Sequence, residues 1–397
     1  MSIESGTTIK NCIIVIPSRL NSSRFPRKAL IKIDGKTLIQ RVIEIAKNVK
    51  GVDQVVVATD SQEIAEESNK YNVESIITSS DHKNGTERLI EVMQNKKAKY
   101  YINLQGDEVI IKPEDIEKAL NQLVKSDSEI VTICRPIALK DGLDPSKVKV
   151  VVSEKNQAIY FSRSVVPFNQ DTLLEHSGVY LFKRSALLKI KDLTTTKLER
   201  NENLEQLRWL EAGISINLSY SNCKSISIDT PNDKTKAERL IKIRKIKSII
   251  TDVDGVLTDG KIIYNSEGEE HKIFSAQDGS AIKRLQMKGY LISILSGRDS
   301  RALRARAQDL GIKNMILGEK DKAIGIKKLQ KIINLTEEEC AYIGDDIEDI
   351  PPMNICGWSF AVANAREEVK SIASQILSKK GGEGVFTEIE SILKISI

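Results

Sequence analysis

The chain has 397 residues, of which 40% are hydrophobic and 29% are charged. At roughly 150 residues per domain, this length predicts two or three domains, and the apolar content is enough for each to bury a core. A disordered or fibrous chain is therefore not expected. Sixty Lys and Arg against 55 Asp and Glu leave a net charge of +5. Because the basic residues are spread along the sequence, we expect no nucleic-acid partner.

No apolar run approaches the roughly 20 residues that cross a bilayer. The first ten residues are polar where a signal peptide would be apolar, so we expect no membrane association and a cytoplasmic location. The five cysteines stand singly, with no C-x-x-C pair, which favours reduced core thiols over a zinc site.

The first half alternates short β-branched runs with segments of helical period, which is typical of an α/β fold. Strands are predicted at 12–16, 54–58, 75–78, 100–104 and 130–134, with helices at 38–48, 62–71, 86–96 and 113–125. This order predicts an open, mostly parallel sheet. The pattern then loosens into an antiparallel pair at 148–152 and 158–161 and a strand at 178–182, which predicts a substrate lobe.

A charged segment at 232–244 predicts a solvated linker helix, and a new α/β series begins directly after it. Its strands are predicted at 248–251, 291–295, 315–317 and 340–343, with a β-hairpin of 260–264 and 271–274 between the first two. We therefore predict two α/β domains, 1–244 and 245–397.

The sharpest motif of the second half places Asp252 and Asp254 directly after the strand at 248–251. Two carboxylates at i and i+2 beyond a strand end can both face the crevice where open α/β sheets bind ligands. One can attack phosphorus while the other moves protons. Alone, such an acidic turn is often only a solvated cap.

Three further elements support phosphoryl transfer. An acidic turn beginning Gly344-Asp345-Asp346 follows another strand and supplies the hard oxygen ligands that Mg²⁺ prefers. Ser296 at a strand end and Lys322 at a helix start could hold phosphoryl oxygens. Four such elements in order are hard to obtain by chance.

The set resembles the haloacid-dehalogenase-type phosphatases, most closely the 3-deoxy-octulosonate (KDO) 8-phosphate phosphatases, across residues 248–397. The resemblance implies a Rossmann-like domain in which a β-hairpin replaces a large cap and builds a tetramer. It implies Asp252 as nucleophile and Asp254 as general acid/base. It also implies phosphate binding by Ser296, Gly297 and Lys322, and Mg²⁺ binding by Asp252, Asp254 and Asp345.

The first half carries a basic loop, Pro17 to Lys28, but neither a P-loop nor a dinucleotide fingerprint. Arg19 and Lys28 on this loop could grip a triphosphate, although alone such a loop is more often a solvent-facing segment. Asp107 and Asp229 each end an apolar strand and could share Mg²⁺ at the sheet's carboxyl edge. A basic loop opposite paired acids is what nucleotidyl transfer requires.

Segments between residues 12 and 233 together resemble the CMP-KDO synthetases. The matching segments include Pro17 to Lys28, Gly85-Thr86-Glu87-Arg88, Gln105-Gly106-Asp107-Glu108, His176-Ser177-Gly178-Val179-Tyr180, Leu204-Glu205-Gln206-Leu207-Arg208 and Asp229-Thr230-Pro231. The resemblance implies an open mixed sheet like that of the nucleotide-diphospho-sugar transferases.

The same resemblance implies roles for residues of these segments. The nucleotide CTP would be bound by Arg19, Ser22, Arg24, Lys28, Gln105 and Asp107, with Arg19 and Lys28 also catalytic. Mg²⁺ would be held by Asp107 and Asp229. The sugar acid would be bound by Arg88, His176, Tyr180, Glu205 and Gln206. A histidine such as His176 would, taken alone, more often be structural. The matching segment around His176 makes it a candidate for sugar binding.

One chain would then carry two consecutive reactions, release of free 3-deoxy-octulosonate from its 8-phosphate and coupling of that acid to CMP. Two alternatives remain open. The C-terminal half could be a non-catalytic assembly module, or both chemistries could act on a nonulosonate or an 8-amino sugar acid. We expect a homo-oligomer, a tetramer through the C-terminal domain.

Overall fold

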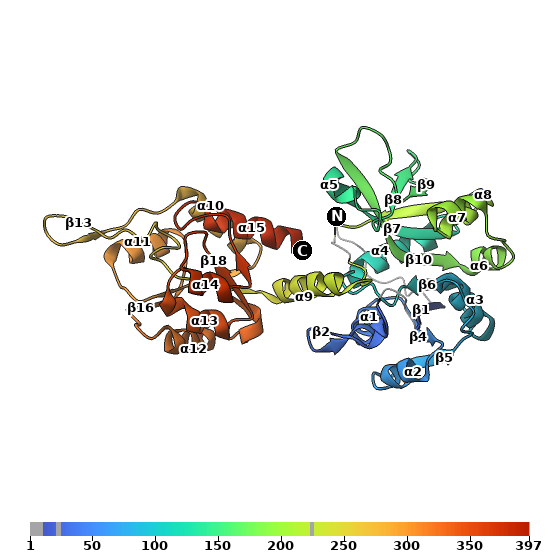
Figure 1. Ribbon diagram of the computed structural model, residues 1–397, viewed down its shortest axis with the longest axis horizontal. Helices are drawn as coiled ribbons and strands as arrows, with labels where there is room; N and C mark the ends of the chain where they lie inside the picture. Colours follow the sequence, from blue (N-terminus) through green and yellow to red (C-terminus); the bar gives the residue numbers. More distant parts are fainter. Residues whose placement is uncertain (1–10, 21–24, 223–225, 397) are drawn as a thin grey trace. The chain divides into compact units, whose positions relative to one another are not determined.

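The computed structural model describes residues 11–20, 25–222 and 226–396, and the chain forms two compact units, Met1–Glu238 and Arg239–Ile397 (Figure 1). Helix α9 (Pro231–Lys245) spans the division, where a charged helix was predicted. The units divide after Glu238 and the predicted domain boundary follows Arg244, both within this helix. No helix in the described ranges is long and apolar enough to cross a membrane.

A nine-stranded mixed sheet forms the centre of the first unit. Its order is β11-β7-β10-β6-β1-β4-β5, with β8 paired to β10 and β9 paired to β8. Strands β6, β1, β4 and β5 are parallel, whereas β10 runs antiparallel to β6 and β7. The strands are β1 (Cys12–Ser18), β4 (Gln54–Thr59), β5 (Glu74–Ile77), β6 (Tyr100–Leu104), β7 (Ile130–Ala138), β8 (Lys149–Val152), β9 (Ala158–Ser162), β10 (Thr172–Lys183) and β11 (Ile216–Tyr220). The predicted parallel series followed by an antiparallel pair is confirmed.

Two strand predictions were incomplete. Strand β11 was not predicted, although it pairs in parallel with β7 over five residues. The strand expected immediately before Asp229 is only an isolated bridge between Ser227 and Glu108. Next to this bridge, Ile228 N donates to the carbonyl of Asp107 (3.2 Å) in the loop after β6. Among the described residues, this segment therefore pairs with a loop and not with a strand.

The helices of the first unit arise from apolar stripes with polar caps. In α1 (Leu38–Lys47), Thr37 Oγ1 accepts from Gln40 N (3.3 Å), while Leu38, Val42 and Ile43 are buried. The others are α2 (Gln62–Asn69), α3 (Gly85–Asn95), α4 (Pro113–Lys125), α5 (Leu139–Gly142), α6 (Arg184–Lys191), α7 (Lys197–Glu202) and α8 (Gln206–Glu211). Short hairpin strands β2 (Lys32–Ile33) and β3 (Lys36–Thr37) precede α1.

The second unit is built on a six-stranded parallel sheet of order β16-β15-β12-β17-β18-β19. Its strands are β12 (Ser248–Thr251), β15 (Leu291–Ser296), β16 (Asn314–Leu317), β17 (Cys340–Gly344), β18 (Trp358–Ala361) and β19 (Gln375–Ile376). Its helices are α10 (Ala276–Met287), α11 (Arg301–Asp309), α12 (Lys322–Ile333), α13 (Ile350–Ile355), α14 (Glu367–Ile372) and α15 (Val385–Ser396). Strands β12, β15, β16 and β17 lie where strands were predicted, whereas β18 and β19 were not predicted.

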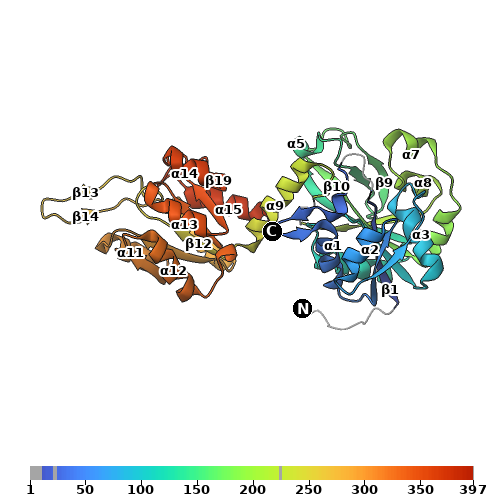
Figure 2. The same ribbon diagram turned by 60° about the horizontal axis from the view of Figure 1, so that its bottom comes forward.

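The predicted hairpin is present but shorter than expected. Only β13 (Ile263–Tyr264) and β14 (Glu270–His271) pair, antiparallel, and the flanking residues are not strand. Figure 2 shows these two strands at the end of a long extended ribbon of the second unit. Ile263, Tyr264 and Ile273 are exposed there, so the ribbon has little core to hold longer pairing.

Candidate active sites

In the first unit, two carboxylates from distant segments converge on one lysine. Asp107 lies three residues beyond β6, and Asp229 precedes α9. Lys28, at the start of a short 3₁₀ turn (Lys28–Leu30), donates from Nζ to Asp107 Oδ2 (2.7 Å), Asp229 Oδ1 (3.0 Å) and the carbonyl of Ile228 (3.1 Å). Burial alone would lower the pKa of Lys28, but the two aspartates raise it overall, so the ammonium stays charged.

This acid pair opens onto a cavity of about 690 Å³. Its lining includes Arg19, Lys28, Gln105, Asp107 and Asp229. Ser22 and Arg24, also predicted to bind nucleotide, lie outside the described residues. Glycine lets the walls approach one another, since a Cβ on Gly106 would stand 2.8 Å from the carbonyl of Pro17. A cavity that presents cations beside paired acids suits a polyphosphate with a divalent cation.

A second cavity of about 730 Å³ adjoins the first, since both are lined by Gln105, Asp107 and Glu205. It brings together four of the five predicted sugar-acid residues, His176, Tyr180, Glu205 and Gln206. A break in register between His176 and Tyr180 in β10 interrupts its pairing with β7. Such bulges re-aim side chains and are frequent beside functional sites.

Several buried polar atoms of the second cavity lack a partner within the described chain. Tyr180 OH, Ser177 Oγ and Glu205 Oε2 have none, whereas Glu205 Oε1 accepts from Thr86 Oγ1 (2.9 Å). Burial raises the pKa of Glu205 to about 7. Burial also lowers the pKa of His176 to about 3, so its ring is neutral at pH 7 and contacts Thr132 Oγ1 (3.0 Å). Unsatisfied buried groups are rare in folded proteins, so this cavity fits a polar ligand.

The fifth predicted sugar residue, Arg88, lies elsewhere. It lines the first cavity and not the second. Its guanidinium is buried and donates to Thr78 Oγ1 (2.5 Å) and Asp60 Oδ2 (3.1 Å), while Asp60 Oδ1 also accepts from Leu20 N (3.3 Å). Arg88 therefore holds the start of the basic loop in place.

Sequence reasoning gave no role to some cavity residues. Arg163 lines the first cavity, and its Nε donates to the carbonyl of Glu202 (2.9 Å). Arg135 and Glu175 form an ion pair in the second cavity. Arg163 ends the segment Tyr160-Phe161-Ser162-Arg163, which also resembles the CMP-KDO synthetases and was a usable signal. Nothing in the local sequence marks Arg135 or Glu175.

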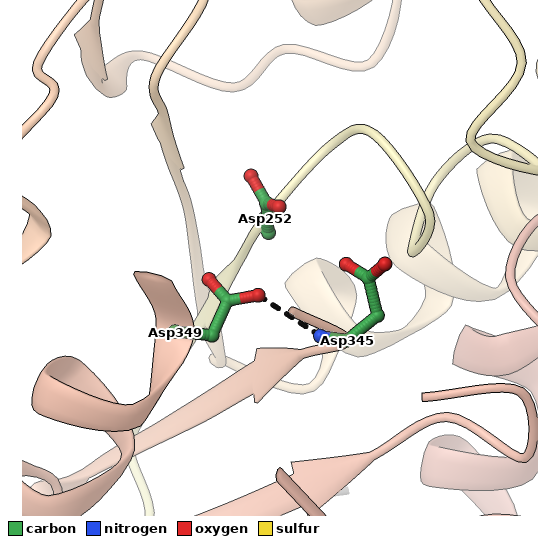
Figure 3. A group of neighbouring side chains, drawn as sticks. All are labelled: Asp252, Asp345 and Asp349. Carbon is green, nitrogen blue, oxygen red and sulfur yellow. Dashed lines mark hydrogen bonds between the residues drawn. The ribbon is translucent and has the colours of Figure 1, made fainter. Parts of the chain in front are cut away.

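In the second unit, Asp252, Asp345 and Asp349 gather at the carboxyl edge of the sheet. Asp252 directly follows β12, and Asp345 directly follows β17. One carboxylate oxygen of each lies within 4.8 Å of those of the others, and Figure 3 shows the three side chains facing a common space. Burial raises the pKa of Asp252 to about 7 and that of Asp345 to about 8, and the charge of Asp349 adds to both shifts.

Lys322 offsets part of this negative charge. Its Nζ lies 3.0 Å from Asp252 Oδ2 and 2.6 Å from Asp349 Oδ1. Asp345 Oδ1 is buried and has no hydrogen-bond partner among the described residues. Crowded carboxylates with an unsatisfied oxygen are a fitting ligand set for a hard divalent cation such as Mg²⁺. Glycine is needed to form the group, because a Cβ on Gly255 would stand 2.0 Å from Asp345 Oδ2.

Asp349 was missed by sequence reasoning as a site residue, although it belongs to the acidic turn. It is fully buried and accepts from Tyr342 OH (2.7 Å) and from the backbone N of Asp345 (2.9 Å) and Asp346 (3.2 Å). The signal was its spacing, four residues after Asp345, which brings its carboxylate back to the start of the turn. Asp349 therefore fixes both Lys322 and the Asp345 loop.

Asp254 and the predicted phosphate residues lie around this group. The carboxylate of Asp254 pairs with Lys272, which follows the hairpin, and lies 3.8 Å from Arg298 Nε. Ser296 is buried and its Oγ accepts from Arg298 N (3.2 Å), while Gly297 beside it is exposed. Lys272 and Arg298 were not predicted, and they place two further cations near Asp254.

The two units thus define one α/β domain with adjoining polar cavities and another with an acidic centre at the carboxyl edge of a parallel sheet. A cytidylyltransferase family model matches residues 13–216, more than half of the chain, and the chain belongs to this family. A haloacid dehalogenase-like hydrolase model matches residues 316–389. The chain therefore joins a cytidylyltransferase domain to a haloacid-dehalogenase-like domain, as predicted.

Known relatives resemble each unit. A 3-deoxy-manno-octulosonate cytidylyltransferase from Koribacter versatilis is 37% identical over 247 residues, 61% of this chain and 94% of the relative. The solved structure of a CMP:2-keto-3-deoxy-manno-octonic acid synthetase complexed with CTP is 39% identical and covers 58% of this chain and 98% of its own, with a TM-score of 0.56. A cobalt-bound deoxy-D-mannose-octulosonate 8-phosphate phosphatase from Haemophilus influenzae is 45% identical, covering 39% of this chain and 91% of its own with a TM-score of 0.38.

We expect Asp349→Ala to destabilise the second unit by about 3–5 kcal/mol, because it leaves the buried Lys322 with one partner fewer and Tyr342 OH with none. Urea unfolding followed by the fluorescence of Trp358, in a Trp209→Phe background, measures this change. Glu348→Ala, at the exposed neighbouring position, should shift stability by less than about 0.5 kcal/mol. Equal midpoints for the two variants would contradict the bridging role of Asp349.

Glu205 should make the first unit less stable as pH rises. Its folded pKa of about 7 exceeds the ordinary 4.5, so the folded state holds the proton more tightly. Stability is greatest below the ordinary pKa and is lost as pH rises from there through the folded pKa of about 7, by about 3 kcal/mol in total. Glu205→Gln removes this loss, so its stability relative to wild type should grow from pH 5 to pH 8. Trp209 fluorescence in a Trp358→Phe background measures the free energy of unfolding at each pH, and the exposed Glu211→Gln is the control. Parallel pH profiles of stability for wild type and Glu205→Gln would refute the raised pKa of Glu205.

Proposed function

We propose that this chain is a bifunctional enzyme that acts on 3-deoxy-octulosonate. The first domain would form CMP-3-deoxy-octulosonate from CTP and the free sugar acid. The second would hydrolyse 3-deoxy-octulosonate 8-phosphate to the sugar acid and phosphate. The first activity is supported by the cytidylyltransferase relatives, and above all by the convergence of Asp107 and Asp229 on one cation at the meeting of two cavities.

In the first domain, the adjoining cavities suggest a division of labour. Arg19 and Lys28, with Ser22 and Arg24 of the same loop, would bind the CTP phosphates and hold pyrophosphate as it leaves. Asp107 and Asp229 would hold Mg²⁺, which when bound supplies positive charge to the phosphate oxygens.

The sugar acid would occupy the second cavity, so that its anomeric hydroxyl meets the α-phosphorus beside Asp107. Neutral His176 with Tyr180, Glu205 and Gln206 would form hydrogen bonds to its hydroxyls. Arg88 acts on the nucleotide side in this proposal, since it lines the first cavity. Attack of the anomeric oxygen on the α-phosphorus breaks the bond to pyrophosphate, whose charge the basic loop stabilises.

In the second domain, Asp252 would attack the phosphorus and form an aspartyl-phosphate while the sugar leaves. Asp254 would protonate the departing oxygen and then take a proton from the water that releases phosphate. Lys322, Ser296 and Gly297 would hold the phosphoryl oxygens. Mg²⁺ would be held by Asp252, Asp345 and the carbonyl of Asp254, and would supply charge neutralisation between carboxylate and phosphate.

Two other functions stay open. A non-catalytic second domain would leave only the transferase, but the presence of Asp252, Asp254, Lys322 and Asp345 with crowded, buried carboxylates favours activity. A nonulosonate or 8-amino sugar acid would keep both chemistries. Pyrophosphate release with CTP across a panel of 3-deoxy-2-keto acids discriminates among the sugars.

We further propose domains at 1–244 and 245–397, a cytoplasmic location, and a homotetramer assembled through the second domain.

The exposed apolar side chains of the hairpin support assembly through the second domain. The double variant Tyr264→Asp, Ile273→Asp should shift the full chain towards monomer in sedimentation velocity, because it places charges on that apolar surface. Met287→Asp, which also replaces an exposed apolar residue but on α10, is the control. An unchanged sedimentation coefficient for the hairpin variant would refute assembly through this ribbon.

Asp107→Asn should abolish CMP transfer and leave phosphatase activity intact, because the two sites share no residue. Asp252→Asn should do the reverse, since it removes the nucleophile and keeps the size of the side chain. Losses of at least 10³-fold are expected in each affected activity. Pyrophosphate release from CTP and phosphate release from the 8-phosphate measure the two. Equally little phosphate from wild type and Asp252→Asn would support the scaffold alternative.

A further inference from the structure

Lys28 lies between Asp107 and Asp229, the two residues proposed to hold Mg²⁺. Its Nζ bonds to one oxygen of each carboxylate, at 2.7 and 3.0 Å. The side chain of Lys28 is only 16% exposed, and those of Asp107 and Asp229 are 21% and 26% exposed. The protein therefore carries its own cation at this pair of acids.

We propose that Lys28 is a resident counter-cation of the acid pair, and that a bound nucleotide triphosphate withdraws its ammonium group and so opens the Asp107–Asp229 site to a divalent cation. This inference rests on the proposed nucleotide site. In addition to binding phosphate, Lys28 couples the binding of the nucleotide to the binding of the metal ion.

Charge is the first argument. The two carboxylates carry two negative charges, and the ammonium neutralises one of them. A divalent cation that approaches the same oxygens meets a positive charge about 3–4 Å away, which repels it strongly in a partly buried site. Lys28 must therefore leave these oxygens before a metal ion can take both of them.

The position of Lys28 makes this exchange possible. It ends the basic loop, lines the first cavity, and carries a flexible four-carbon side chain with rotatable donors. A triphosphate in that cavity offers it oxygens of greater negative charge within reach of a side-chain rotation. Because coupling between two ligands is reciprocal, metal bound at the acid pair must also release Lys28 and strengthen nucleotide binding.

The first test measures Mn²⁺ binding by calorimetry to the full chain without nucleotide. An Asp252→Asn, Asp345→Asn background weakens the second domain as a competing metal site. Lys28→Met should tighten Mn²⁺ binding roughly 5- to 150-fold, the usual range of coupling between sites. Arg27→Met is the matched control: it removes the same charge one residue away, but Arg27 pairs with Glu63 instead of the acid pair, so its affinity should stay near that of the parent. Equal or weaker Mn²⁺ binding by Lys28→Met overturns the proposal.

The second test measures CTP binding in EDTA to the same background. Asp229→Asn frees Lys28 from one carboxylate and should tighten CTP binding, whereas unchanged or weaker binding overturns the withdrawal step. If the parent binds no CTP with or without Mg²⁺, both the proposed nucleotide site and the withdrawal of Lys28 by nucleotide are wrong.

The Mn²⁺ comparison still decides in that case whether Lys28 blocks metal binding at Asp107 and Asp229. Failure of the nucleotide site is therefore distinguishable from failure of the counter-cation role.

Discussion

Crowded carboxylates at the carboxyl edge of a sheet are the constraint on which both sites depend. Aspartates gathered within a few ångströms repel one another, and each unit compensates with a lysine that bridges two of them. Lys28 joins Asp107 to Asp229, and Lys322 joins Asp252 to Asp349. A lysine compensates only part of the charge in either group, which leaves each site able to accept a more highly charged cation.

The two lysines differ in how firmly they are held. Lys322 lies in the first turn of α12, is 7% exposed, and contacts Asp349, which Tyr342 and two backbone N–H groups fix in turn. Lys28 lies at the end of a loop, and both of its aspartates line an open cavity. The same charge pattern thus gives a rigid centre in the second unit and an exchangeable one in the first.

Much of this arrangement could be predicted from the sequence because it is local. Strands β1 and β12 are short, mostly β-branched runs, and β6 is a short, mostly aromatic and aliphatic run. Polar residues follow each of them, and in each unit the parallel strands bring their carboxyl ends to one edge of that unit's own sheet. Strands β11, β18 and β19 were missed, and the strand expected at Ser227 is only a bridge. Whether a short run becomes a strand depends on a partner elsewhere in the chain. The hairpin was overextended because its exposed side chains give longer pairing little core to pack against.

The properties of the sites depend on contacts that no local pattern encodes. The neighbours of Asp349 include Tyr342 and Lys322, which the fold brings to it from other elements. Arg88 lines the first cavity, where it contacts Asp60 and Thr78, although the resemblance implied that it binds the sugar acid. Burial in the folded unit raises the pKa of Glu205 to about 7, although a hydrogen bond from Thr86 in α3 acts in the opposite direction. The sequence therefore indicates which chemical groups reach each sheet edge, whereas packing determines their charge, their partners and their freedom to move. In this chain, those three properties distinguish the fixed acidic centre around Lys322 from the centre around Lys28, which a bound ligand can open to a metal ion.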